Sequence, residues 1–381
     1  MRIGIPLQSL DATWGGIGIY TEEIVRALLR VDRANEYVLI YPGFGAPRKR
    51  FGQYRRFKHA VEVETAFSRV PSGLYWDQAI LPRVARQHGV DVLFNPFLSV
   101  PIRGGFRKVL VLHNIEYHTV PQVYHWRLYA RWFFLERVLL PRADRVIAIS
   151  RAMTEDMRRL GRYPIDRVRT VYHGVSEKFR VIDDPARLAA ARDEYELPAR
   201  FILFVGHLYP QKNFATLVRA FHRLADRVPH DLVVVGRPRW RYEGDLALID
   251  ALGVRSRVHV LYWVPNDDLP AIYNLADCFV YPSLYEAFGL AQLEAMACGC
   301  PVVGARAGAI PEVCGDAAVL FDPRDPEELA EAVVRVLEDR ALRRALIERG
   351  LARAREFTWE RAARETLRVL EEAAADGGRR P

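Results

Sequence analysis

Two glutamates stand eight residues apart in the second half of the chain, within the run YPSLYEAFGLAQLEAMACGCPVV. Glu286 comes before a predicted helix that begins near Gly289, and Glu294 lies inside that helix. The predicted strand Cys278 to Tyr281 precedes both, and ligands bind beyond the carboxyl ends of parallel strands. Because carboxylates accept hydrogen bonds from paired hydroxyls, the two side chains suit a ligand with a sugar at each end of a diphosphate. Glutamates at this spacing are also common on solvated surfaces, so the spacing alone leaves both interpretations open.

The same sheet edge is expected to carry groups that bind an anion. A helix that begins near Gly289 presents free backbone N–H groups, here those of Phe288 to Leu290. Lys212 adds a cation, because it follows a buried strand that ends at Val205–Gly206. Only five of the 55 basic residues are lysines, so a lysine at this position is unusual in a chain that otherwise uses arginine. We interpret Lys212 as a phosphate ligand, the alternative being a solvated loop lysine.

Three residues of the first half are candidates for the same ligand. Gly15 and Gly16 follow the first predicted strand and precede a helix that begins near Ile19. Glycine there would let the backbone approach a phosphate or an acceptor closely. His113 ends the strand predicted over Lys108 to Leu112. A lone histidine in such a position is more often structural than functional, so its assignment depends on its context.

Short β-rich runs alternate with helical patterns along the chain, which is typical of doubly wound parallel sheets. The predicted strands are Arg2–Pro6, Tyr37–Tyr41, Asp91–Phe94, Lys108–Leu112 and Arg145–Ile149, then Arg200–Val205, Asp231–Gly236, Val258–Leu261, Asp277–Tyr281 and Pro301–Gly304. The polar stretch Ser176–Pro198 is the predicted linker. Asp325 followed by Pro326 predicts a helix start, and an amphipathic helix is expected after Thr358. The fold class is therefore α/β with two doubly wound, Rossmann-like domains.

Length and composition agree with a two-domain enzyme. The 381 residues exceed the size at which single cores stop growing, and half of them are hydrophobic. No uninterrupted apolar run approaches the roughly 20 residues that a bilayer crossing needs, and no signal-peptide pattern precedes the first strand. We therefore expect a cytoplasmic protein. The four cysteines show no metal-binding spacing and are expected to be reduced, mostly buried thiols.

Charge is distributed unevenly. Residues 1–180 contain 29 Lys and Arg against 16 Asp and Glu, and residues 181–381 contain 26 against 31, so +13 and -5 make up the net +8. A basic face attracts nucleic acid, anionic lipid or phosphorylated substrate, and no nucleic-acid motif supports the first. The segment Tyr124 to Arg142 interleaves arginines with aromatic residues. This composition suits peripheral association with a membrane interface, or else the aromatics fill the first domain's core.

The run E-A-F-G-L-x-x-L-E-A-M-A-C-G-x-P-V-V resembles the donor-site signature of family 4 retaining glycosyltransferases. Further segments extend the resemblance over nearly the whole chain: RIGIP, GGIGIYTEEIVRAL, VLHN, VYHGV, FVGHLYPQKN and AIPEVCGDAAVLFDPRDPEELA. The resemblance implies a GT-B fold, in which two Rossmann-like domains face a central cleft. It assigns residues 1–178 to the acceptor-binding domain, 179–357 to the domain that binds the nucleotide-sugar donor, and 358–381 to a helix that crosses back to the first domain.

The resemblance also implies roles for single residues. Family members carry an arginine at the position of His207 and a lysine at that of Lys212, and both neutralise the donor diphosphate. His113 would orient the hexose, so His113, Lys212 and Glu286 are the predicted catalytic residues. The predicted donor-binding residues are Gly15, Gly16, His207, Lys212, Glu286, Phe288, Gly289, Leu290 and Glu294. A histidine cannot form the bidentate clamp of a guanidinium, which puts the phosphate geometry in doubt.

The predicted reaction is transfer of a hexosyl group to a hydroxyl with retention of anomeric configuration. The chain has no D-x-D motif, so we expect neither metal nor cofactor, and by resemblance the leaving phosphate deprotonates the acceptor. The variant P-x-K-N resembles mannosyltransferases that use GDP-mannose, and UDP-hexoses remain open. The acceptor is a glycan, a lipid-linked sugar or a small molecule. The alternatives are a sugar-nucleotide 2-epimerase on the same fold and a two-domain sugar-binding protein.

Overall fold

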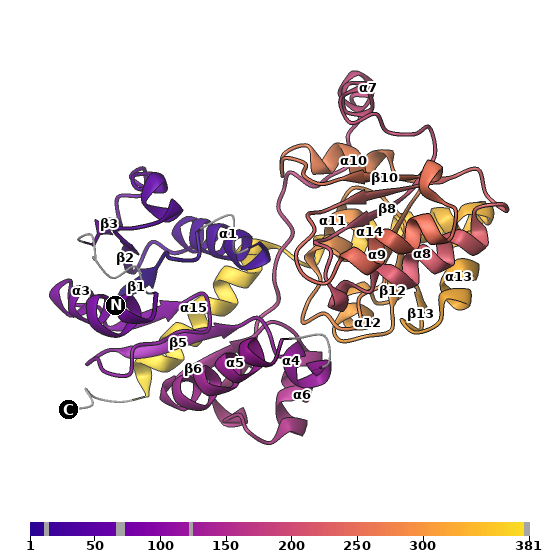
Figure 1. The fold of residues 1–381 in the computed structure, drawn as a ribbon. Helices are drawn as coiled ribbons and strands as arrows, with labels where there is room; N and C mark the ends of the chain where they lie inside the picture. Colours follow the sequence, from indigo (N-terminus) through magenta and orange to yellow (C-terminus); the bar gives the residue numbers. More distant parts are fainter. Residues whose placement is uncertain (11–14, 66–72, 122–124, 377–381) are drawn as a thin grey trace. The chain divides into compact units, whose positions relative to one another are not determined.

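The computed structural model describes residues 1–10, 15–65, 73–121 and 125–376 (Figure 1). The chain divides into two compact units. Unit 1 comprises Met1–Ile115, Tyr124–Gly174 and Trp359–Pro381, and unit 2 comprises Glu116–Val123 and Val175–Thr358. The main divisions thus fall after Gly174 and Thr358. The assignment of Glu116–Val123 to unit 2 was not anticipated.

Unit 1 is built on a parallel sheet in the order β3-β2-β1-β4-β5-β6-β7. Its strands are β1 (Arg2–Pro6), β2 (Glu36–Tyr41), β3 (Ala60–Glu64), β4 (Val92–Asn95), β5 (Arg107–Leu112), β6 (Arg145–Ala148) and β7 (Val168–Thr170). Strand order reverses beside β1, since β2 and β4 pair with its two sides. In such a sheet, ligands bind at the carboxyl ends of the strands near this switch point.

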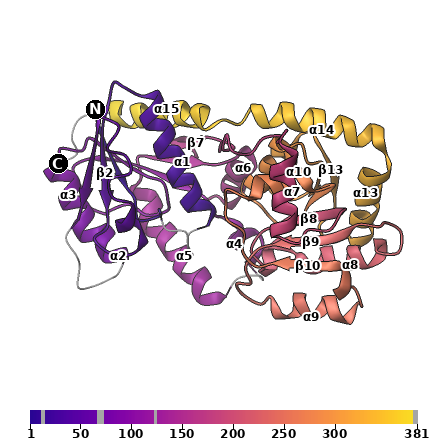
Figure 2. The same cartoon turned by 90° about the horizontal axis from the view of Figure 1, so that it is seen from above.

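The helices of unit 1 complete its layers around the sheet. They are α1 (Gly16–Val31), α2 (Gly73–Tyr75), the π-helical turn Trp76–Ile80, α3 (Leu81–Gln87), α5 (Trp126–Leu139), α6 (Arg151–Leu160) and α15 (Trp359–Ala375). The C-terminal helix α15 packs alongside α1, so the two ends of the chain share one layer (Figure 2). The sequence therefore returns to its first domain at its last helix.

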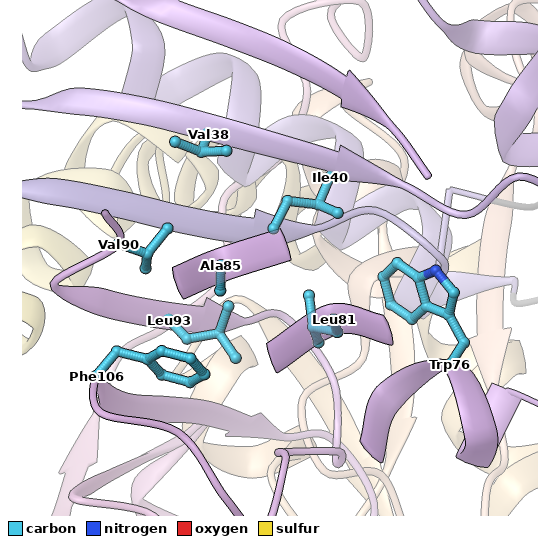
Figure 3. Packing of buried hydrophobic residues seen from close by; sticks show 8 residues of the cluster. All are labelled: Val38, Ile40, Trp76, Leu81, Ala85, Val90, Leu93 and Phe106. Atoms are coloured by element: carbon cyan, nitrogen blue, oxygen red, sulfur yellow. The ribbon is translucent and has the colours of Figure 1, made fainter. Parts of the chain in front are cut away.

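Apolar side chains fill the space between the sheet of unit 1 and α3. Trp76, Leu81 and Ala85 pack against Val38 and Ile40 of β2, with Val90, Leu93 and Phe106 completing the cluster (Figure 3). The indole Nε1 of Trp76 donates a hydrogen bond to Thr65 Oγ1 at 3.0 Å, so its one polar atom has a partner. Each fully buried side chain of this size stabilises the fold by roughly 1.5–3 kcal/mol.

Unit 2 contains a second parallel sheet, in the order β10-β9-β8-β11-β12-β13. Its strands are β8 (Phe201–Val205), β9 (Asp231–Val235), β10 (Val258–Leu261), β11 (Cys278–Tyr281), β12 (Val302–Ala305) and β13 (Ala318–Phe321). The strand order reverses between β8 and β11, which pair directly. The residues after these two strands therefore meet at the switch point.

Helices surround this second sheet. They are α7 (Pro185–Glu194), α8 (Phe214–Leu224), α9 (Glu243–Ala251), α10 (Leu269–Leu275), α11 (Leu290–Ala297), α12 (Ile310–Cys314), α13 (Pro326–Glu338) and α14 (Arg340–Arg355). Asp325 caps α13 by accepting from the backbone N–H groups of Glu327 and Glu328, as its position before Pro326 predicted. All four cysteines of the chain are unpaired and buried, as expected.

Two sequence-based expectations about the elements were wrong. The segment Ser176–Pro198 is not an irregular linker, because α7 occupies its middle, with Asp184 accepting from the N–H groups of Ala186 and Arg187. Three edge strands were also missed: β3, β7 and β13. β3 alternates along AVEVE with little burial, and β7 is only three residues long, so neither shows the apolar run that marks the central strands.

Candidate active site

The centre of the candidate site is an ion pair at the switch point of unit 2. Lys212 Nζ lies 2.6 Å from Glu286 Oε1 and 3.1 Å from the hydroxyl of Tyr281, the last residue of β11. Both charged side chains are largely buried, with 13% and 11% of their surface exposed. Burial lowers the pKa of Lys212, but the charge and hydrogen bond of Glu286, together with Tyr281 and Tyr209, hold that pKa well above its ordinary value. The predicted partners of one ligand are therefore in direct contact.

The backbone around Lys212 is held by side chains on both sides of it. Asn213 has φ 55°, and its Nδ2 donates to the carbonyls of Pro282 and Pro323 at 3.0 and 2.6 Å. Gln211 Nε2 donates to the carbonyl of Tyr285 at 2.7 Å. These bonds tie the turn after β8 to the turn after β11. The position of Lys212 is thus fixed by hydrogen bonds from the side chains of its two sequence neighbours, Gln211 and Asn213.

Glu286 is held from its backbone as well. Its carbonyl accepts from the N–H of Ala309 at 2.8 Å. Gly308 precedes that residue with φ +53°, and a Cβ on Gly308 would lie 2.3 Å from the carbonyl oxygen of Glu286. Only glycine can occupy such a position. Tyr281 and Gly308 neighbour the ion pair and were not predicted as site residues, although Tyr281 lies in the run that contains Glu286 and Gly308 directly precedes the segment that begins at Ala309.

Glu294 occupies a separate environment. Its Oε2 accepts from the hydroxyl of Tyr273 on α10 at 3.1 Å, and the carboxyl is buried on α11. Burial raises the pKa of Glu294 to about 7, against lowering contributions from Tyr273 and the charge of Lys178. The two glutamates of the motif thus have different partners and different electrostatics. This difference agrees with two distinct tasks for them.

The start of α11 presents the expected amides. Gly289 is the residue before the helix, with φ 93°, and no side chain caps it. Gln292 is fully buried, and its Nε2 donates to the carbonyl of Phe288 at 3.1 Å, while its Oε1 accepts from Cys314 Sγ at 3.3 Å. The C=O and N–H of one trans peptide point in opposite directions. With the Phe288 carbonyl drawn toward buried Gln292, the N–H of Gly289 points away from that side chain.

His207 follows β8 at the same edge as Lys212. Its Nδ1 accepts from the backbone N–H of Arg237 at 3.4 Å, which leaves Nε2 as the donor of the neutral ring. Burial lowers the pKa of His207 to about 4, helped by the charges of Arg239, Lys212 and Arg237. At neutral pH the ring is therefore uncharged. It offers one hydrogen bond in the place where the family resemblance implies a guanidinium.

The candidates of unit 1 lie at the carboxyl edge of its sheet. His113 follows β5 and donates from Nε2 to the carbonyl of Pro96 at 2.9 Å, and burial lowers its pKa to about 4. Its ring packs edge-on against Tyr20, with centroids 4.7 Å apart. Gly15 precedes α1 with φ +53°, and a Cβ on Gly15 or Gly16 would meet none of the described residues within 4 Å. The part of the chain that the structure describes thus leaves space beside these glycines, whereas His113 is part of a packed aromatic cluster.

Sequence and structure comparisons agree with this arrangement. Residues 14–179 match the Glycosyltransferase Family 4 model, and residues 191–353 match Glycosyl transferases group 1. The chain is 33% identical to O-antigen chain mannosyltransferase B of Escherichia coli over 267 residues, covering 68% of this chain and 69% of that protein. It is 34% identical to the serotype-specific mannosyltransferase WbdA of the same species over 61% of this chain, but spans only 29% of WbdA.

Among solved structures, the complex of Anabaena HepE with UDP and glucose superposes with a TM-score of 0.76 at 21% identity, covering 98% of this chain and 100% of HepE. The likeness extends over both units and supports the GT-B arrangement of two Rossmann-like domains. An ion pair at the switch point of the second domain, a helix N-terminus beside it and family models over both halves lead to one assignment. The chain belongs to glycosyltransferase family 4, the group 1 glycosyl transferases.

Proposed function

We propose that the protein transfers a mannosyl group from GDP-mannose to a hydroxyl acceptor with retention of anomeric configuration. The observation that carries this proposal is the buried contact between Lys212 and Glu286 beside the uncapped start of α11. A cation, free backbone amides and a carboxylate that can accept hydrogen bonds from hydroxyls thus lie at one sheet edge, which supports the proposal. The choice of mannose is supported by the similarity to two mannosyltransferases.

The chemical demand on the site is charge stabilisation. As the bond between the anomeric carbon and the phosphate oxygen breaks, negative charge grows on the departing diphosphate and positive charge on the sugar ring. Lys212, the Nε2 hydrogen of His207 and the N–H of Gly289 are the donors for the diphosphate in this proposal. Glu286 accepts hydrogen bonds from the hexose, and Glu294 accepts them from the ribose. His113 retains Nδ1 as an acceptor for a hexose hydroxyl.

The transfer step balances without a protein base. The acceptor oxygen forms a bond to the anomeric carbon on the face from which the diphosphate leaves. The acceptor's proton passes to an oxygen of that diphosphate, which is both the leaving group and the base. The products are the glycosylated acceptor and the nucleoside diphosphate. We assign no metal to this step, since Lys212 and the amides take the charge.

A donor screen tests the proposal. GDP-mannose, UDP-glucose, UDP-galactose and ADP-glucose are incubated with the enzyme and a panel of glycan, lipid-linked and small-molecule acceptors. We expect release of GDP with formation of an α-mannosylated product, whose configuration is read by NMR. Release of another nucleotide contradicts the donor assignment. Conversion of the donor to its 2-epimer without transfer contradicts the reaction.

Gln292 is expected to act as a positioning residue for the diphosphate. Gln292→Met keeps the side-chain volume but removes the hydrogen bond that fixes the Phe288–Gly289 peptide. Losing that orientation should lower kcat about tenfold, the effect of one hydrogen bond of roughly 1.4 kcal/mol, with little change in KM for the donor. Steady-state kinetics together with thermal unfolding measure this. A variant that loses stability but keeps its kcat contradicts the positioning role.

Peripheral membrane association is a further part of the proposal. Trp126 and Phe134 of α5 are 69% and 62% exposed, and the guanidinium of Arg127 lies 5.4 Å from the ring of Trp126. No helix among the described residues is long and apolar enough to cross a bilayer. Exposed aromatics beside arginines suit the interface of an anionic membrane. The proposed location is the cytoplasmic face of that membrane, with a lipid-linked acceptor.

The exposed aromatics give this part of the proposal its test. Trp126→Ser with Phe134→Ser should reduce co-flotation with vesicles that contain phosphatidylglycerol, because both side chains would insert between headgroups. Trp263, which is 61% exposed in unit 2, provides the matched control Trp263→Ser. We expect the control to float like the wild type. Equal flotation of all three proteins, or equal binding to neutral vesicles, contradicts membrane association through α5.

A further inference from the structure

A basic cavity lies at the edge of the unit 1 sheet opposite to its candidate site residues. It has a volume of about 990 Å³ and is lined by residues at the amino ends of three adjacent strands. Arg2 begins β1, Glu36 begins β2, and His59 directly precedes β3. Gly15 and His113 instead follow the carboxyl ends of β1 and β5. The cavity is therefore separate from the residues proposed to contact the glycosyl donor.

The charges of this cavity are not balanced. Its lining contains four cationic side chains, Arg2, Arg33, Arg56 and Lys58, and a single carboxylate, Glu36. Glu36 is already paired with Arg2 at 2.6 Å. Within the described part of the chain, no carboxylate lies within ion-pair distance of the other three cations. Clustered cations without counter-charges repel one another, and an anion relieves that repulsion.

His59 adds a polar donor to the lining. Its Nδ1 lies 3.4 Å from Nη1 of Arg33, and a guanidinium can only donate, so Nδ1 is the acceptor. The neutral ring then carries its hydrogen on Nε2. That atom is buried and has no hydrogen-bond partner among the residues that the structure describes. A buried donor without an acceptor is costly, so an anionic oxygen that reached it would be stabilised.

We propose that this cavity is a second anion site, which binds a phosphate group through Arg33, Lys58 and His59. Phosphate fits better than carboxylate, because its oxygens can accept from a guanidinium fork, an ammonium and an imidazole at once. The phosphate belongs either to a soluble phosphorylated compound or to a phospholipid headgroup. Both present the same oxygens to the same side chains. The site is independent of the glycosyl donor and of its diphosphate.

Histidine NMR tests the site directly. The wild-type protein, labelled with ¹³C in its histidine rings, is titrated with pyrophosphate, and His59 is assigned from the spectrum of a His59→Gln variant. We expect the His59 signals to shift in a saturable manner, and the affinity to fall as salt is added. The signals of His207 report separately on pyrophosphate at the candidate active site. Unmoved His59 signals at pyrophosphate concentrations on the order of 10 mM overturn the proposal.

Matched double variants separate a specific site from general charge. Arg33→Gln with Lys58→Gln should weaken pyrophosphate binding at His59 by about tenfold or more, since two charged contacts are lost. Arg83→Gln with Lys49→Gln removes two exposed cations of unit 1 that do not line the cavity, and should leave the affinity unchanged. Equal weakening by both pairs overturns the proposal. The glycosyl transfer activity of either pair plays no part in this readout.

Vesicle sedimentation distinguishes the two sources of phosphate. The protein is mixed with phosphatidylcholine vesicles with and without phosphatidylglycerol. If the ligand is a lipid headgroup, the Arg33→Gln, Lys58→Gln variant loses sedimentation with the anionic vesicles and the control pair does not. If sedimentation is the same for both pairs while pyrophosphate binding is lost only in the first, the ligand is a soluble phosphate compound. Each result identifies the occupant of the same site.

Discussion

Replacing Lys212 with alanine is expected to lower kcat by about 100-fold or more, with a much smaller effect on donor affinity. The contact between this ammonium and the diphosphate strengthens as negative charge grows toward the transition state, so its loss falls mainly on the chemical step. Steady-state kinetics with varied donor measure both parameters. Activity of the wild type should persist in EDTA, because the charge is carried by protein groups.

The ion pair requires a careful control for this experiment. Lys212→Ala leaves the Glu286 carboxylate largely buried without its cation, and breaking a buried pair in this way costs about 3–5 kcal/mol of stability. Adding Glu286→Gln removes the uncompensated charge. The double variant should therefore regain much of the lost stability and none of the lost turnover. A Lys212→Ala enzyme with near-normal kcat, or abolition of wild-type activity by EDTA with rescue by magnesium, contradicts the mechanism.

Replacing Glu294 with glutamine is expected to weaken nucleotide binding by roughly 1.5–3 kcal/mol, the contribution of a hydrogen bond to a charged group. The same change should stabilise the ligand-free protein at alkaline pH. The pKa of Glu294 is raised from 4.5 to about 7 in the folded state, so the folded protein binds this proton more tightly than the unfolded chain. Wild-type stability therefore falls as pH rises from about 4.5 to 7.

Glu294→Gln is expected to be stabilising because it removes the carboxyl group whose ionisation destabilises the folded protein. It should be absent below pH 4.5 and should reach about 3 kcal/mol above pH 7, from 1.36 kcal/mol per pKa unit. Urea unfolding at pH 4.5 and pH 8 measures it. Calorimetry of wild-type nucleotide binding at pH 6 in two buffers should show proton release, since ribose hydroxyls favour the carboxylate. Unchanged nucleotide affinity in the variant contradicts the assignment of Glu294 to the ribose.

The sequence predicted the central strands of both sheets, because they are short apolar runs bounded by polar turns. It did not predict α7, although Asp184 and Pro185 repeat the cap and N1 proline that identified α13 at Asp325 and Pro326. The helix was missed because polar residues surround it and PARLAAARDE lacks a clear apolar face. Edge strands such as β3 were not predicted for a related reason, because half-exposed strands lack a continuous run of apolar residues.

The residues of the candidate site were likewise predicted only in part. Spacing and residue type singled out Lys212, Glu286 and Glu294 as candidates, because parallel strands bring their carboxyl ends to one edge. The family resemblance was needed to prefer ligand binding over a solvated surface. The direct contact between Lys212 and Glu286 joins residues 74 positions apart and depends on which strands are neighbours. Nothing in the sequence distinguishes Gln292 from an ordinary residue of a helix. Only its burial beside the Phe288 carbonyl reveals its part in the site.

The return of the last helix to unit 1 has a consequence for the order of folding during synthesis. The apolar face of α15, including Trp359, Ala363 and Leu370, is buried in unit 1, beside helix α1 from the start of the chain. A ribosome makes these residues after every strand of unit 2. The other elements of unit 1 therefore wait with an uncovered apolar surface until the elements of unit 2 have been made. Nascent chains of this protein should need protection on that surface while unit 2 is being synthesised.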